Sequence, residues 1–420
     1  MIPIRKVLMP GVELLYCRSD KFKTGVLSCN FILPMTKESI CSSALLACVL
    51  RRGTEKYPDI AAISEALDLN YGARLEAVTR KKGEYHCVGL LASFIDDRFT
   101  PQGEKLLEPM ADMMGEMLLH PTLQNGVFRE DYVAQEKENL LDDIRARKND
   151  KREWADYCLL KALCAGEPYG VFREEEHLCG VTPESLYVHY REILSSAPVK
   201  IVYCGSAEQS RVEAALMHAL RELPREKQLI LPKVRRHILR CEVQQICESM
   251  DVTQAKLAMG FGTTSDDFSA LMLANALFGG TSNAKLFLHV REELSLCYYV
   301  STQLHRSKGV ITLSSGIAAK DYDRACSEIM RQLKNLQEGR FEPWEIPGAR
   351  SILRGVYRAA ADAPGRIESF TLGEAVMGTY QSFEDYLRGI EETDKDRIIA
   401  AAKTIALDTV YFLTGKEAAQ

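Results

Sequence analysis

Two stretches of this chain resemble each other. The first, residues 43–54, reads S-A-L-L-A-C-V-L-R-R-G-T, and the second, residues 269–281, reads S-A-L-M-L-A-N-A-L-F-G-G-T. With one gap the second repeats most of the first in the same order, about half a chain length away. Such self-similarity predicts an internal duplication, so the chain is expected to fold as two like domains.

The segments that flank the two copies keep the same order. Upstream of each copy lies an alternating apolar run, residues 25–31 and 255–261, which is typical of a strand. Far downstream, each half closes on a β-rich run that ends in glycine, at Gly205 and Gly415. The matching segments occur in the same order in both halves, but the distance between them varies. Loop insertions in a duplicated domain would produce this pattern.

Length and composition agree with two domains. A chain of 420 residues with 46% hydrophobic content can bury two ordinary cores. Residues 223–237 mix proline and charge without helical periodicity, so we expect the linker there. With the boundary placed near Gln228, the predicted domains are residues 1–227 and 228–420. Strand runs and long helical patterns mix in both halves, which predicts an α+β class with helices packed on a sheet.

Helical periodicity is strongest in six segments. The first is apolar nearly all round and ends at Gly53, so it is expected to be buried on most sides. The second contains Pro109, where a kink or a helix start is expected. The predicted helices cover residues 39–53, 103–119, 129–163, 269–278, 321–337 and 343–358.

Composition excludes several classes of function. The net charge of −5 and the 26% charged residues point to neither nucleic acid nor a membrane surface as a partner. Thirteen cysteines without a C-x-x-C pair, in a sequence that opens without a signal-peptide pattern, predict reduced thiols and a cytoplasmic location. The longest apolar run, residues 44–50, is far shorter than the roughly 20 residues of a membrane helix.

The common catalytic motifs are absent from the sequence. There is no phosphate-binding loop, no nucleophile elbow and no dinucleotide-binding glycine pattern. The eight histidines never pair at i, i+4, so neither orientation of the zinc-binding helix occurs. The acidic cluster before His177, residues 174–177, is interpreted as a solvated helix face or turn.

The most specific pattern follows the second copy. Residues 279–298 read G-G-T-S-N-A-K-L-F-L-H-V-R-E-E-L-S-L-C-Y. They resemble the second-domain signature of the pitrilysin/insulinase family of metallopeptidases, roughly G-G-x-x-S-x-L-F-x-x-[LV]-R-E-x-x-x-L-x-Y. Arg291 and Tyr298 fall on the family's arginine and tyrosine, which contact the bound peptide backbone and the reacting carbonyl. Residues 167–170, E-P-Y-G, are similar to the family's H-P-x-G.

This resemblance covers nearly the whole chain and implies a fold. The family is built from two homologous α+β domains, each a mostly antiparallel sheet packed with helices, which together form half of a clamshell. The resemblance also implies an inverted zinc motif, H-x-x-E-H, shortly before a G-T pair in the first domain. Its two histidines hold Zn²⁺ from one helix face, and its glutamate takes a proton from the metal-bound water.

In this chain the zinc motif has been replaced. Counting back from Gly53, its three positions fall on Ala44, Ala47 and Cys48. The family's further metal-ligand glutamate, on a later helix, maps to Asp143. One thiolate and one carboxylate are too few ligands for zinc, and an alanine cannot act as the base. No zinc and no catalytic residue are therefore expected in this chain.

Three further residues or segments have simpler interpretations. Glu136 falls on a supporting acidic position of the family. Cys48 has no histidine on its helix to act as a base, so it is interpreted as a buried structural thiol rather than a nucleophile. Lys285 is expected to be a surface charge, and the basic stretch at residues 145–152 is expected to be a solvated helix face or to face an acidic peptide.

The resemblance implies a particular division of labour. Bacterial relatives of this size often work as heterodimers, in which one subunit carries the zinc motif and the other retains only the arginine and tyrosine. Our hypothesis is a noncatalytic subunit that positions peptide substrates with Arg291 and Tyr298 for a homologous, zinc-bearing partner. The alternatives are a purely structural scaffolding protein of the same fold and a stand-alone peptide-binding module.

Overall fold

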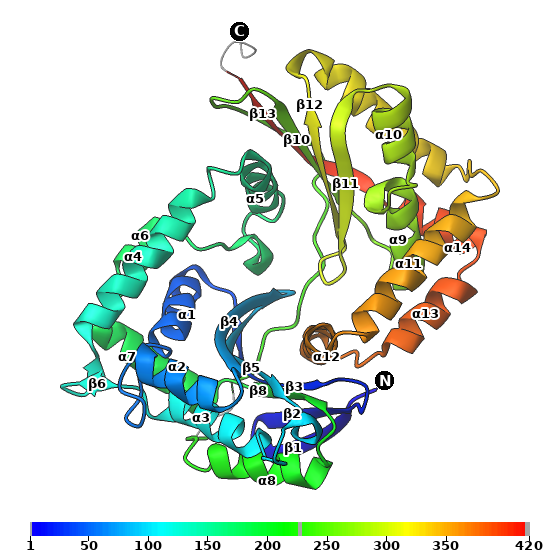
Figure 1. Cartoon of the computed structure of the whole chain (residues 1–420). Coiled ribbons are helices and arrows are strands. Elements are labelled where there is room, and N and C mark those ends of the chain that lie inside the picture. Colours follow the sequence, from blue (N-terminus) through cyan, green and yellow to red (C-terminus); the bar gives the residue numbers. More distant parts are fainter. Residues whose placement is uncertain (1, 226–228, 416–420) are drawn as a thin grey trace. The chain divides into compact units, whose positions relative to one another are not determined.

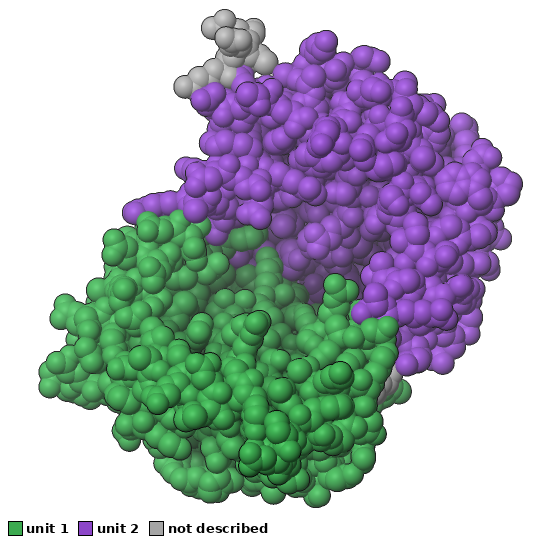
Figure 2. All heavy atoms as spheres, viewed as in Figure 1, with its two compact units in different colours: residues 1–144, 172–233, 360–382 green, residues 145–171, 234–359, 383–420 purple. Residues whose placement is uncertain are grey.

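The computed structural model describes residues 2–225 and 229–415 of the chain (Figure 1). Contacts divide the chain into two compact units, coloured separately in Figure 2. Unit 1 comprises Met1–Ile144, Phe172–Lys233 and Ala360–Ser382, and unit 2 comprises Arg145–Val171, Val234–Ala359 and Phe383–Gln420. The boundary predicted at Gln228 lies outside the described residues, and the division into domains 1–227 and 228–420 stays a prediction.

Unit 1 is built on a six-stranded sheet with the order β1-β2-β8-β3-β5-β4. Strands β2 and β8 run parallel, and the other neighbours pair antiparallel. The central strand β3 is buried over nearly its whole length, which means that both faces of the sheet are covered. The strands are β1 (Ile4–Met9), β2 (Val12–Arg18), β3 (Thr24–Pro34), β4 (Arg74–Lys82), β5 (Tyr85–Ile95) and β8 (Val199–Gly205).

Unit 2 has a five-stranded sheet with the order β11-β12-β10-β13-β9. Here β9 and β13 run parallel, and the other pairs are antiparallel. Read from the opposite edge, this order matches β2-β8-β3-β5-β4 of unit 1 strand for strand. The predicted α+β class with two like domains is therefore confirmed. The strands are β9 (Gln244–Ser249), β10 (Ala255–Gly262), β11 (Cys297–His305), β12 (Val310–Ile317) and β13 (Ala406–Thr414).

Helices cover these sheets and connect their strands. The first half contains α1 (Lys37–Val49), α2 (Ile60–Leu69), α3 (Leu107–Leu119), α4 (Glu130–Ala146), α5 (Lys151–Leu163), α6 (Glu175–Cys179), α7 (Pro183–Ser196) and α8 (Gln209–Ala219). The second half contains α9 (Phe268–Asn275), α10 (Tyr322–Gln337), α11 (Glu345–Ala361), α12 (Pro364–Met377), α13 (Phe383–Glu392) and α14 (Lys395–Lys403). Within the two described ranges, no helix combines the length and the apolar character needed to cross a membrane.

Local sequence explains where several of these helices begin. Thr36 caps α1 by accepting a hydrogen bond from the backbone N–H of Ser39. Pro109 lies in the first turn of α3, where backbone N–H groups have no acceptor within the helix. The missing N–H of the proline therefore breaks no hydrogen bond, and the helix starts there without a kink. The single helix predicted over residues 129–163 is wrong, because Asp150 caps a new helix, α5, after a break.

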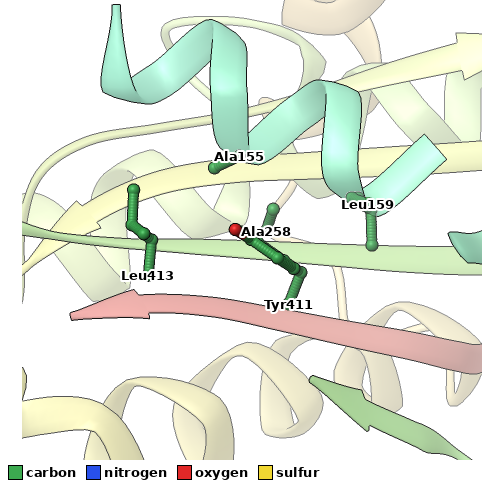
Figure 3. Close-up of a cluster of buried hydrophobic side chains, with 5 residues drawn as sticks. All are labelled: Ala155, Leu159, Ala258, Tyr411 and Leu413. Atoms are coloured by element: carbon green, nitrogen blue, oxygen red, sulfur yellow. The ribbon is translucent and has the colours of Figure 1, made fainter. Parts of the chain in front are cut away.

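Each sheet is covered on one face by a helix that comes from the other half of the sequence. Helix α12 packs on β3 and β8 of unit 1, and α5 packs on β10 and β13 of unit 2. In unit 2 the contact is an apolar cluster, shown in Figure 3, which consists of Ala155, Leu159, Ala258, Tyr411 and Leu413. A division of the chain into two domains at a single boundary does not predict that α5 and α12 each pack on the sheet formed by the other half of the sequence.

In unit 1 the contact with α12 is polar. The carboxylate of Glu368, which is 1% exposed, accepts hydrogen bonds from Ser28 Oγ at 2.5 Å and from Arg80 at 2.6 and 2.9 Å. Arg80 also donates to Asn30 Oδ1 at 2.6 Å. A buried carboxylate is tolerated only when it is paired and its oxygens are satisfied. Glu368 therefore fixes both the position and the register of α12 on the sheet.

We expect Glu368→Gln to destabilise unit 1 by about 3 kcal/mol, because it leaves the largely buried Arg80 charge without its counter-ion. The measurement is urea unfolding followed by circular dichroism. The control is Glu208→Gln, which removes the exposed ion pair with Arg18 and should cost far less. Equal midpoints for the two variants would contradict the anchoring role of Glu368.

Candidate functional site

The segment in the position of the zinc motif is the central part of α1. Ala44 and Ala47 are 1% and 2% exposed, and their methyl groups offer no ligand atom. Cys48, one residue further, is partly buried. The helix is buried on most sides, as predicted, so these positions now contribute to the core of unit 1.

The acidic positions of α4 lie close enough to Cys48 to influence its thiol. Burial first, and then the negative charge of Glu136 and more weakly that of Asp143, raise the pKa of the Cys48 thiol. Glu136 is held in an ion pair at 3.1 Å by Arg52, which follows the end of α1, while Asp143 is exposed. A protonated thiol beside an arginine-paired carboxylate is a poor ligand set for zinc.

A different group of metal-ligand types occurs in unit 2. Within residues 2–225 and 229–415, Cys164, Glu167 and His237 are the one set of three whose candidate ligand atoms all lie within 4.8 Å of one another. Sequence reasoning missed this set, because its members are far apart in the chain and follow no metal-binding spacing. Glu167 stands where the resembled family has the histidine of H-P-x-G.

The partners of this set indicate an ion network and not a metal site. His237 Nδ1 lies 2.7 Å from Glu167, and His237 Nε2 lies 3.2 Å from Asp408. Lys308, which is fully buried, lies 2.5 Å from the other oxygen of Glu167. Arg240 pairs with Asp408 at 2.5 Å. Since both ring nitrogens of His237 face carboxylates, neither offers a lone pair to a metal.

Titration behaviour agrees with this assignment. Burial lowers the pKa of His237, but the hydrogen bonds and charges of Glu167 and Asp408 outweigh burial and raise that pKa above its usual value. Burial raises the pKa of Glu167, yet His237 and Lys308 bring it below its usual range. The network is therefore a set of charged groups that neutralise one another inside unit 2.

Arg291 lies on an unusual helix. Residues Leu286–Glu293 form a π-helix, η4, and π-turns are rare and concentrate at functional sites. The guanidinium stacks over the ring of Phe287 at 4.5 Å from the ring centroid. Its ion-pair partner is Glu292, at 3.5 Å, and the side chain is 39% exposed. Arg291 is thus held in place by stacking while its N–H groups stay available to a ligand.

Tyr298 also lies on irregular backbone. It is the second residue of the edge strand β11, at a point where the pairing register with β12 shifts between Cys297 and Tyr299. Such bulges re-aim a side chain and are frequent next to active sites. Tyr298 is 77% exposed, so it contributes little to the core. Burial raises the pKa of the Cys297 thiol, against the smaller lowering effects of the hydrogen bond with Ser315 and of the positive charge of Arg291.

Lys285 corrects one expectation from the sequence. It was expected on the surface, but it is 4% exposed and its ammonium contacts both carboxylate oxygens of Glu345, at 2.8 and 2.9 Å. The reason is that α11 begins beside η4 and brings Glu345 in its first turn. The basic stretch at residues 145–152 spans the end of α4 and the start of α5, where Arg152 stacks on Tyr299.

Comparison with known proteins agrees with the two-unit fold. A family model described as "Peptidase M16 inactive domain" matches residues 180–353. "Probable inactive metalloprotease YmfF" from Bacillus subtilis (strain 168) is 31% identical over 415 residues, covering 97% of each chain.

Two further matches extend this picture. "Uncharacterized zinc protease YmxG" from the same Bacillus strain is 19% identical and covers 76% of this chain and 78% of its own. The crystal structure of a conserved protein from Enterococcus faecalis V583 superposes with a TM-score of 0.89 at 24% identity, covering 99% of both chains. This last likeness concerns the fold.

We expect the isolated chain to bind no stoichiometric zinc through α1, because Cys48 lacks companion ligands. After equilibration with zinc and removal of free metal, atomic absorption should give the same zinc content for the wild type and for Cys48→Ala. Cys179→Ala, which removes an exposed thiol, is the control. One zinc per chain that disappears only in Cys48→Ala would show that the site is functional.

The ion network predicts a pH-dependent stability. Because the folded pKa of His237 is raised, its contribution is complete below the unfolded value of about 6.5 and is lost as the pH rises through the folded pKa. The lowered pKa values of Glu167 and Asp408 make their contribution complete above about pH 4 and lost on acidification.

The difference in unfolding free energy between wild type and His237→Gln should therefore be larger at pH 5.5 than at pH 9, as measured by urea unfolding. His218→Gln, which replaces an exposed histidine of unit 1, is the control and should change stability little at either pH. An equal loss at both pH values for His237→Gln would mean that packing alone, and not charge, explains its effect.

Proposed function

We propose that this chain, which belongs to the M16 peptidase family, is an inactive member that serves as the noncatalytic, substrate-positioning subunit of a heterodimeric zinc endopeptidase. The observation that carries the proposal is the contrast between two regions. The zinc positions on α1 have become core alanines, whereas Arg291 and Tyr298 keep exposed polar ends on a π-helix and a strand bulge. Tyr298 is 77% exposed and the Arg291 side chain is 39% exposed, so a role in binding is the better explanation.

The proposed division of labour follows from what this chain lacks. Peptide hydrolysis in this family needs a metal-activated water, which a homologous subunit with an intact H-x-x-E-H would supply. This chain has an alanine in place of the general base and no histidine on α1. It can contribute only by binding and by electrostatics.

Arg291 is suited to hold the peptide. Its guanidinium is always charged and offers five N–H donors in a fixed plane, which fits backbone carbonyl oxygens. Stacking on Phe287 limits the conformations of the side chain, so less entropy is lost when a peptide binds. The loose contact with Glu292, at 3.5 Å, leaves the donors free.

Tyr298 is suited to stabilise the charge that develops during cleavage. A phenol O–H aimed at the reacting carbonyl would donate a hydrogen bond that strengthens as the oxygen becomes an oxyanion. Removing one donor of this kind typically costs about 10²–10³ in kcat. The bulge at the start of β11 supports this role, because Tyr298 lies at the register shift and its side chain is exposed.

The compartment proposed for this complex is the cytoplasm. All thirteen cysteines are free thiols, and several are fully buried. Reduced cysteines in this number are typical of a reducing compartment.

The test is co-expression with a homologous chain from the same organism that carries H-x-x-E-H. The purified complex should cleave an internally quenched peptide, and Arg291→Ala should lower kcat/KM by about 10²-fold. Tyr298→Phe should lower kcat, with a smaller change in KM, because its donor acts mainly on the transition state.

Two controls separate positioning from assembly. Arg324→Ala removes an exposed arginine of α10 and should leave the rate unchanged. Gel filtration should show that Arg291→Ala still forms the complex. If the complex forms and its rate does not depend on Arg291 or Tyr298, the chain is a scaffolding subunit and the proposal is wrong.

A further inference from the structure

One edge of the sheet in unit 2 has no partner strand among the described residues. Strand β9 ends the order β11-β12-β10-β13-β9 and pairs with β13 on one side only. Gln244, Gln245, Cys247 and Ser249 of this strand are exposed. We call the open side of β9 the β9 edge. Its unpaired backbone N–H and C=O groups form a template to which a further strand can add.

Unit 1 shows what the corresponding position holds. In the strand-for-strand match of the two sheets, β2 corresponds to β9. The outer side of β2 is paired with β1, which runs antiparallel to it, and all residues of β2 except Arg18 are buried. Unit 2 has no counterpart of β1 among its described residues. An antiparallel strand beside β9 would therefore complete the arrangement that unit 1 already has.

The other edges of the two large sheets carry features that oppose the addition of a strand. Strand β1 contains Arg5 and Lys6, and its pairing register shifts between Val7 and Met9. Strand β4 reads R-L-E-A-V-T-R-K-K, and β11 has the register shift next to Tyr298. Basic side chains and bulges are common means by which proteins keep the edges of sheets from pairing.

The β9 edge lacks these protections. Its sequence, Q-Q-I-C-E-S, contains no lysine, arginine or proline, and its pairing with β13 has no register shift. Its single charged residue, Glu248, accepts hydrogen bonds from Trp154 Nε1 at 3.0 Å and from the hydroxyl of Tyr411. This carboxylate is thus held by groups of unit 2. The edge is therefore regular and carries no charge that would repel a second strand.

The backbone of β9 presents hydrogen-bonding groups to the open side at alternate residues. The N–H of Met250, directly after the strand, donates to the carbonyl oxygen of Thr414 at 3.0 Å. Neighbouring residues of a strand point their N–H and C=O groups to opposite sides, so the groups of Gln245 and Cys247 face the β9 edge. Each of these two residues can exchange a pair of hydrogen bonds with an antiparallel strand.

We propose that the β9 edge is a dimer interface, at which β9 pairs antiparallel with β9 of a second copy of this chain. A second copy has this same edge to offer, because the other edges of its large sheets are protected. A twofold axis between the two Ile246 residues places Gln245 opposite Cys247 and Gln244 opposite Glu248. In this register the two central residues are apolar, and no like charges lie opposite each other.

The dimer interface is separate from the proposed positioning residues. Strands β9 and β11 are opposite edges of the same sheet, and Tyr298 lies on β11. Pairing at β9 therefore leaves Tyr298 at the other edge of the sheet. The proposed dimer does not depend on a zinc-bearing partner, so it is tested on this chain alone.

Association is measured by sedimentation equilibrium of the full chain over a range of concentrations. The wild type should show a reversible equilibrium between monomer and dimer. Gln245→Pro should raise the Kd about tenfold or more, because it removes a donor on the open side and no hydrogen bond to β13. Gln245→Lys, which changes only an exposed side chain, should weaken the dimer in the same direction should Gln245→Pro fold poorly. Val7→Lys, at an exposed position of β1, is the control and should leave the Kd unchanged.

Cross-linking tests the register. The two Cys247 residues of the dimer would lie about 8 Å apart, from the rise of two residues along a strand and the spacing between strands. A bismaleimide of that length should link two wild-type chains but not two Cys247→Ser chains. Cys179→Ser, which removes an exposed thiol of unit 1, should still be linked.

Two results would overturn the assignment. The first is a wild-type chain that stays monomeric at every concentration. The second is a dimer whose Kd is unchanged in both Gln245→Pro and Gln245→Lys, or whose cross-linking persists in Cys247→Ser, because the contact would then lie on another surface. Neither result bears on the peptidase activity of the complex, so failure of the dimer and failure of the proposed function are distinguishable.

Discussion

The fold depends on covering both faces of two sheets with helices exchanged between the halves of the sequence. A sheet whose central strand is apolar on both sides must be covered twice, and in unit 1 the second cover is α12. One buried carboxylate, Glu368, fixes that helix through Arg80 and Ser28. In unit 2 the corresponding contact with α5 is apolar, so the two repeats have reached one architecture with different chemistry.

Some parts of this fold could be predicted from the sequence and others could not. The repeat at residues 43–54 and 269–281, with its flanking strands, was enough to predict two α+β domains, because apolar periodicity survives duplication. The exchange of α5 and α12 could not be predicted, since a helix pattern does not say which sheet the helix covers. The break at Asp150 was missed because a capping aspartate is hard to distinguish from other charged residues in a basic stretch.

The candidate site also contains both residues that the sequence can suggest and residues that only the structure reveals. The replaced zinc positions and the pair Arg291 and Tyr298 are predictions from a linear motif, which can be recognised in the sequence alone. The burial of Lys285 and the network around His237 depend on partners 60 and 70 residues away or more, at Glu345 and Glu167. Long-range ion pairs leave no signal in local spacing, so a buried lysine looks like any surface lysine.

The proposed replacement of the zinc motif on α1 has a simple physical account. Histidines and a glutamate on the buried face of α1 are stable only while a metal satisfies them, because unpaired polar groups in a core are costly. Alanine at positions 44 and 47 removes that cost and strengthens helix formation. Packing alone therefore accounts for the apolar character of α1. It does not explain an exposed tyrosine on a bulge or an arginine on a π-helix, and these are the features that a binding role requires.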